Sequence, residues 1–140
     1  MSVHDSKSDP TKEELRDFYH RYVAAANNRD FDTISSLVND EVTVNDVPHK
    51  REDVVAALKG IADVTPDFTW HIEDLITTGD RIAARLRDTG TPTKEIFGEE
   101  PTGASIEITE FAAYRVRDGR FVEMWFLMDV ASAVQQLGRK

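Results

Sequence analysis

The sequence predicts an α+β fold in which the helices come first and the long strands follow. Apolar residues recur at helical spacing in residues 10–60 and alternate with polar residues in residues 68–128. The turn signals Gly79-Asp80 and Asp118-Gly119 separate long strand patterns by the short connections of antiparallel hairpins. Runs of helices followed by runs of strands are typical of α+β domains.

Three helices are expected in the first half of the chain. The first begins at Asp9-Pro10, because aspartate caps a helix and proline suits its first turn. Asp30 or Asp32 begins a short second helix, and residues 51–59 form a third that ends at Gly60 as a C-cap. The apolar stripe of the first helix consists of Leu15, Phe18, Tyr19, Tyr22, Val23 and Ala26.

The strands follow a short strand at residues 41–46 and a turn at residues 47–49. The four long strands are predicted at residues 68–76, 81–89, 104–116 and 120–128, with a loop at 90–103 and a final short helix from Val130 to Gly138. The stretch from Glu123 to Asp129 is apolar on both faces, which predicts a strand buried on two sides.

Composition restricts the function. The chain of 140 residues is long enough for one domain with a core, and we expect a flexible arm at residues 1–10 followed by a single domain at 11–140. A formal charge of −9 disfavours phosphate backbones, so no nucleic-acid partner is expected. The absence of cysteine excludes disulfides, thiolate metal sites and cysteine nucleophiles.

The sequence also lacks the patterns of several other protein classes. No apolar run is long enough to span a bilayer and the first residues are polar, so we expect a cytoplasmic protein with no membrane partner. The four histidines do not show the spacing of a zinc site, and no metal is expected. Serine-nucleophile and nucleotide-binding motifs do not occur in the sequence.

Two carboxylates are candidates for acid/base chemistry. Glu110 lies among small and apolar residues of a strand, where desolvation raises the pKa of a carboxyl and suits it to proton transfer. The alternative for Glu110 is an ion pair with Arg85 or Arg87 on a neighbouring strand. Asp129 precedes the last helix, so capping that helix competes with a catalytic role.

Several short motifs, taken in order, resemble the SnoaL-like polyketide cyclase family of the NTF2-like superfamily, over about residues 12 to 138. The motifs are Asn27-Asn28, Pro66-Asp67, Gly79 to Ala83, Thr89-Gly90-Thr91, Phe97 to Gly103, Tyr114 to Arg120, Glu123-Met124-Trp125, Asp129 and Gln136-Leu137-Gly138.

The resemblance implies a cone-shaped barrel. In such a barrel, a curved antiparallel sheet is wrapped around about three N-terminal helices and encloses a deep apolar pocket. A short C-terminal helix follows the sheet. It also implies a homodimer formed through the sheet. Cyclases of this family close a ring by an intramolecular aldol reaction, without metal or cofactor, and use a pocket aspartate as general acid/base. No cofactor is therefore expected.

The chain departs from the cyclase pattern at the polar pocket positions. By the resemblance, the catalytic aspartate falls at Phe126, and histidines of the family fall at Met124, Ala112 and Pro92. Only Asp129, the second aspartate of the final-strand pattern, matches. The expected ligand-pocket residues are Tyr19, Tyr22, Trp70, Ala112, Tyr114, Met124, Phe126 and Met128, although aromatic residues at these spacings are also common in a plain core.

Two hypotheses follow. In the first, the protein is a cofactor-independent enzyme of cyclase or isomerase type that acts on a hydrophobic polycyclic or polyketide-like molecule, with Glu110 as acid or base and Tyr19, Tyr22 or Tyr114 orienting the substrate oxygen. In the second, the protein is a non-catalytic binding or accessory protein with an apolar ligand pocket. Both predict a small hydrophobic molecule as partner.

Overall fold

The computed structural model describes residues 10–138, so the arm expected at residues 1–10 lies outside the described part of the chain apart from Pro10. Four helices and six strands follow one another in the predicted order of helices first and long strands after them. The elements are α1 (Lys12–Asn27), α2 (Phe31–Leu37), β1 (Val38–Val44), β2 (Val47–Lys50), α3 (Arg51–Val64), β3 (Thr69–Thr78), β4 (Arg81–Gly90), β5 (Ile106–Arg117), β6 (Arg120–Met128) and α4 (Val130–Leu137).

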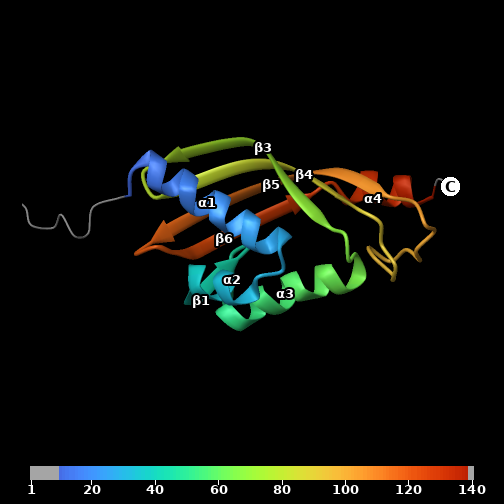
Figure 1. Cartoon of the computed structure of the whole chain (residues 1–140), viewed down its shortest axis with the longest axis horizontal. Helices are drawn as coiled ribbons and strands as arrows, with labels where there is room; N and C mark the ends of the chain where they lie inside the picture. The colour runs from blue at the N-terminus through green and yellow to red at the C-terminus, as the bar shows by residue number, and fades with distance from the viewer. Residues whose placement is uncertain (1–9, 139–140) are drawn as a thin grey trace, which may run out of the picture.

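The strands form one curved, unclosed sheet in the order β2-β1-β6-β5-β4-β3. Figure 1 shows α1 running along one face of the long strands, with α2 and α3 on the same side. Helix α4 lies at the end of the long strands that is far from the start of α1. This arrangement confirms the α+β class, because the helices cover one face of a largely antiparallel sheet. None of the helices in residues 10–138 has the length and apolar character needed to cross a membrane.

The sheet is antiparallel as expected except at one junction, which is parallel. Strand β1 runs parallel to β6, and the chain between them includes α3 and the other long strands. The hairpin of β1 and β2 turns at Asn45-Asp46, not at residues 47–49, and both turn residues have positive φ values of 49° and 70°. Their side chains attach the hairpin to β6: Asn45 Oδ1 accepts from the Phe126 N–H at 2.9 Å, and Asp46 Oδ1 accepts from the Trp125 indole N–H at 3.0 Å.

Two predicted helix ends were wrong. Helix α1 is capped by Thr11 and not by Asp9, because Thr11 Oγ1 accepts from the Glu14 N–H at 3.0 Å and Glu14 Oε1 accepts from the Thr11 N–H at 2.8 Å. Helix α3 continues past Gly60 to Val64, with Thr65 as its C-cap, and Ile61 directly after the glycine packs against the core.

The two faces of the sheet differ in burial. The inward side chains of β5 are buried at every second position: Ile106, Ile108, Glu110, Ala112, Tyr114 and Val116. The outward side chains are open, and Leu127 on β6 and Phe111 on β5 are 72% and 56% exposed. The prediction that the β6 strand is buried on two sides was therefore wrong, because helices cover only its inner face.

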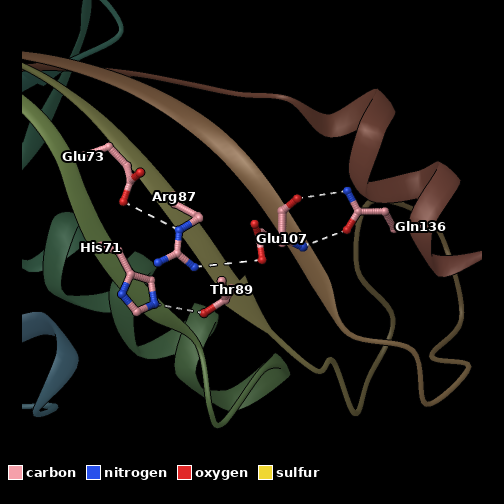
Figure 2. Close-up of polar contacts among 6 residues, drawn as sticks. All are labelled: His71, Glu73, Arg87, Thr89, Glu107 and Gln136. Atoms are coloured by element: carbon pink, nitrogen blue, oxygen red, sulfur yellow. Dashed lines mark hydrogen bonds and ion pairs between the residues drawn. The ribbon is translucent and has the colours of Figure 1, made fainter.

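Helix α4 protects the end of β5 that extends past β6. Figure 2 shows the Gln136 side-chain amide beside the Glu107 backbone: its Nε2 donates to the Glu107 carbonyl at 2.9 Å, and its Oε1 accepts from the Glu107 N–H at 2.7 Å. The amide therefore pairs with the strand edge as a neighbouring strand would, and it satisfies two backbone groups that are otherwise left open. Ala133 and Leu137 of the same helix pack on Ile106 and Ile108.

We expect Gln136→Ala to lower the free energy of unfolding by about 1–2 kcal/mol, because both hydrogen bonds to the β5 edge are lost. Urea denaturation followed by far-UV circular dichroism measures the change. The matched control is Gln135→Ala, since Gln135 is the exposed neighbour on the same helix. Equal effects of the two substitutions would contradict this role for Gln136.

Candidate active site

A cavity of about 450 Å³ lies between the inner face of the sheet and helices α1 and α3. Its wall is mostly apolar, and six of the eight residues expected to line a ligand pocket belong to it: Tyr19, Tyr22, Trp70, Tyr114, Phe126 and Met128. The other two, Ala112 and Met124, are buried in the core and do not line this cavity. Met124 is fully buried because it lies between Tyr114 of β5 and Val44 of β1 in the sheet.

Three tyrosines supply hydroxyl groups to the cavity wall. The hydroxyls of Tyr19 on α1 and Tyr114 on β5 lie 3.1 Å apart, and their ring centroids are separated by 5.1 Å. Burial raises the pKa of Tyr19, Tyr22 and Tyr114 well above the usual range of a phenol. All three therefore stay neutral near pH 7 and keep their hydroxyl hydrogens.

Glu110 is buried in the cavity wall beside a second acid, Asp88. Glu110 is 3% exposed and Asp88 is fully buried. In the register of β4 and β5, Asp88 faces Ile108 and Leu86 faces Glu110, so the two acids are diagonal neighbours on the inner face. Among the described residues, neither oxygen of Asp88 nor Oε1 of Glu110 has a hydrogen-bond partner.

No arginine neutralises this pair. Figure 2 shows the Arg87 guanidinium on the other face of the sheet, where it lies 3.6 Å from the Glu73 carboxylate and 3.9 Å from that of Glu107. Arg85 occupies the same outward register as Arg87 on β4. Within residues 10–138, neither Glu110 nor Asp88 forms an ion pair, which removes the alternative of an arginine-paired Glu110.

Burial raises the pKa of both acids. For Asp88, desolvation is the largest cause and the neighbouring Glu110 adds to it. For Glu110, desolvation also dominates, while its polar neighbours Asp88 and Trp70 act in the opposite direction. The two carboxyls thus influence each other's ionisation, although no hydrogen bond of good geometry joins them. The pair resists carrying two negative charges near neutral pH.

His49 and Asp53 form a second polar part of the cavity wall, which the sequence reasoning missed. His49 Nδ1 lies 3.4 Å from Asp53 Oδ2, and the Lys50 N–H donates to the same oxygen at 2.8 Å. That backbone hydrogen bond is the main reason why the pKa of Asp53 is lowered. Asp88 was also missed, although the alternation of Ile82, Ala84, Leu86 and Asp88 along β4 was a signal that could have revealed it.

Asp129 lies outside the cavity wall. Its Oδ1 accepts a hydrogen bond from the Ser132 N–H at 3.1 Å, so it is the N-cap of α4. Among the described residues, no three histidine or acidic side chains gather in a way that suits a metal ion.

Comparison with known proteins decides the family. The profile of the SnoaL-like polyketide cyclases matches residues 16–137. The chain belongs to this family. A search of curated proteins finds no match.

Solved structures agree with the assignment of this SnoaL-like protein. The putative polyketide cyclase IdmH from Streptomyces antibioticus is 30% identical, with a TM-score of 0.80 over 88% of this chain and 97% of that one. A SnoaL-like polyketide cyclase from Agrobacterium tumefaciens is 26% identical, with a TM-score of 0.83 over 89% and 98%. TsrD from Streptomyces laurentii, at 22% identity, a TM-score of 0.84 and coverage of 94% and 100%, supports the fold alone. The NTF2-like fold is thus confirmed.

The carboxyl pair predicts an unusual dependence of stability on pH. Because the folded-state pKa values of Asp88 and Glu110 are raised, their contribution to stability is fully present below the unfolded pKa of about 4 and is lost as pH rises through the folded values. We expect Glu110→Gln to gain stability relative to wild type as the pH is raised from about 5 to 9, because only wild type loses the contribution of Glu110 as this carboxyl ionises.

Urea denaturation of both proteins across this pH range measures the difference. Glu107→Gln is the control, because Glu107 is the exposed acid on the outer face of the same strand. A difference between Glu110→Gln and wild type that stays constant with pH would show that the buried acids do not titrate as described.

Proposed function

We propose that this SnoaL-like protein is a cofactor-independent acid/base enzyme for an apolar, polyketide-like carbonyl compound, with Glu110 as the residue that transfers the proton. The observation that carries the proposal is the Glu110 carboxyl: it lines an apolar cavity, and its Oε1 has no partner among residues 10–138. A buried carboxyl without a partner is costly to the fold, so a site of this kind points to function.

The cavity itself supports the class of substrate. About 450 Å³ is within the range of small-molecule sites, and a mostly apolar wall favours a hydrophobic body with few polar groups. Phe126 of β6 adds to the apolar wall at the position where the resemblance places the catalytic aspartate of the cyclases, and Met128 of the same strand lines the wall as well. The named cyclases among the structural relatives favour a polyketide-like compound.

The tyrosines complete the chemistry. Tyr19 and Tyr114 share one hydrogen bond between their two hydroxyls, so one hydroxyl hydrogen of the pair remains able to donate to a substrate oxygen. In the proposed step, Glu110 takes a proton from a carbon next to a carbonyl, and the electron pair of the broken C–H bond forms the enolate. The donated hydrogen bond stabilises the negative charge that develops on the enolate oxygen.

Ring closure follows without any added reagent. The enolate carbon attacks a second carbonyl of the same molecule and forms the new C–C bond, and the resulting alkoxide takes back the proton from Glu110. Glu110 therefore begins and ends the cycle in the same protonation state. An isomerisation ends instead with return of the proton to another carbon of the enolate.

Glu110→Gln tests the proposal, because glutamine keeps the shape of the side chain but cannot accept the proton. We use 1-tetralone, an apolar ketone with exchangeable hydrogens next to its carbonyl, and follow their replacement by deuterium in D₂O by ¹H NMR. Wild type is expected to accelerate exchange, and Glu110→Gln to lose about 100-fold or more of the acceleration.

Glu107→Gln on the outer face is again the matched control, and it is expected to retain the wild-type rate. Retention of the rate by Glu110→Gln would reject Glu110 as the proton-transfer residue. If wild type gives no acceleration and native mass spectrometry finds an apolar molecule bound, the result favours the alternative of a non-catalytic binding or accessory protein, for which the apolar Phe126 wall is the supporting observation.

We further propose that the protein is a homodimer formed through the outer face of the sheet. Leu127 and Ile76 are 72% and 58% exposed there, and Phe111 lies directly beside Leu127 in the strand register. Trp125 and Ala113 belong to the same shallow hollow. A second copy presents an equal apolar face, and two-fold pairing covers both faces at once.

Leu127→Glu is expected to convert the dimer to a monomer, because it brings a charge from each copy into the same apolar contact. Light scattering after size-exclusion chromatography measures the mass. Val47→Glu is the control, since Val47 is 53% exposed on β2, away from this face. A monomeric wild type, or a Leu127→Glu variant that stays dimeric, would reject the proposed interface.

A further inference from the structure

Asp88 is a buried acid that the proposed reaction does not use. It lies on β4 with no exposed surface, it does not line the cavity, and both of its oxygens lack a hydrogen-bond partner among the described residues. An isolated ionised carboxylate in such a place is very costly, so Asp88 has to be neutral or to share a proton with a neighbour. Its position between Trp70 of β3 and Ile108 of β5 leaves Glu110 as the neighbouring acid.

The side chains around Asp88 and Glu110 determine what can balance the charge of the two carboxyls. Burial, with a smaller contribution from Glu110, raises the pKa of Tyr19 and Tyr22 of α1 and of Tyr114 of β5, so all three remain neutral phenols. On β3, Trp70 presents an indole that carries no charge. His49 and Asp53 at the α3 side of the cavity pair with each other. Within residues 10–138 no cation pairs with either acid, so a proton is the charge-balancing group available to them.

We propose that Asp88 is the positioning residue for Glu110, and that the two carboxyls hold one proton between them near neutral pH. Diagonal neighbours on adjacent antiparallel strands bring side chains of this length within reach of each other. In this state the hydroxyl of Asp88 donates to one oxygen of Glu110. The accepting oxygen is Oε1, which is buried and has no other partner among the described residues, and Oε2 is left as an acceptor toward the cavity that Glu110 lines.

The catalytic part of this inference rests on the proposed function. When Glu110 takes a proton from the ligand, the pair holds two protons and no charge, and it returns to one proton and one negative charge when the alkoxide is protonated. A hydrogen bond from Asp88 favours the ionised form of Glu110 and so makes the base available at a lower pH. The sharing of the proton itself does not depend on any turnover.

Infrared spectroscopy of the wild-type protein tests the sharing directly. Protein with ¹³C in the aspartate side chains is compared with unlabelled protein at pH 7, so that the carboxylic-acid C=O band of an aspartate is identified by its isotope shift. We expect such a band in wild type, its loss in Asp88→Asn, and a move to higher frequency in Glu110→Gln, where the hydrogen bond to the carboxylate is lost. Absence of an aspartic-acid band at pH 7, or a band that Glu110→Gln leaves unchanged, overturns the proposal.

The pH profile of 1-tetralone exchange tests the positioning role. Asp88→Asn keeps a hydrogen-bond donor, and we expect its rate to stay within about threefold of wild type with the same midpoint. Asp88→Leu removes the donor, and its midpoint is expected to rise by about one pH unit or more. Equal midpoints in wild type and Asp88→Leu, with both proteins folded by circular dichroism, reject the positioning role.

The two proposals fail differently. If Glu110→Gln retains exchange while the infrared band behaves as expected, the proposed function is wrong and the shared proton stands. If the infrared band is absent while Glu110→Gln abolishes exchange, the shared proton is wrong and the proposed function stands.

Discussion

The packing of α1 against the concave face of the sheet is the contact on which the rest of the structure depends. Phe121 of β6 is fully buried and lies 4.8 Å from the rings of both Phe18 and Tyr22, measured between centroids, and 4.7 Å from Tyr114. These contacts bury a large apolar area, and the pairs of Phe121 with Phe18 and Tyr22 have favourable edge-to-face geometry. They hold the helix along the strands and close one side of the space under the sheet. The remaining space, between α1, α3 and the sheet, is the cavity.

The burial of the polar groups in and beside the cavity wall gives them their properties. A carboxyl on an open strand ionises readily, whereas Glu110 and Asp88 are buried and no cation pairs with them within the described residues. Desolvation therefore raises the pKa of both, and it also keeps the tyrosines neutral. The same packing that stabilises the core thus produces the acids and hydroxyls that the proposed chemistry uses.

Alternation along the strands separates two kinds of surface. On β5, Glu110 faces the cavity while its neighbour Phe111 faces outward, and on β6 the pair Phe126 and Leu127 does the same. The inner face belongs to the proposed site, and the outer face to the proposed contact between copies. Within the SnoaL-like family, fold alone does not choose a substrate, so the distinguishing features are these individual side chains.

Local patterns in the sequence were sufficient for most elements, because they depend on near neighbours. The period of two in residues 106–116 predicted a strand with Glu110 inward, and Asp129 before an apolar run predicted the cap of α4. The capping box of Thr11 and Glu14 was also present in the sequence as a local signal, which the prediction of a start at Asp9-Pro10 overlooked. The Phe126 assignment came from a family resemblance and not from any local pattern.

Contacts between residues far apart in the chain were decided only by the tertiary structure. The parallel pairing of β1 with β6 depends on where α3 returns the chain, and no local period encodes it. The proximity of Asp88 and Glu110 requires the register of β4 against β5. The sequence by itself determined which residues point inward; the register between strands decided which of them meet, because side-chain direction is a local property and strand pairing is not.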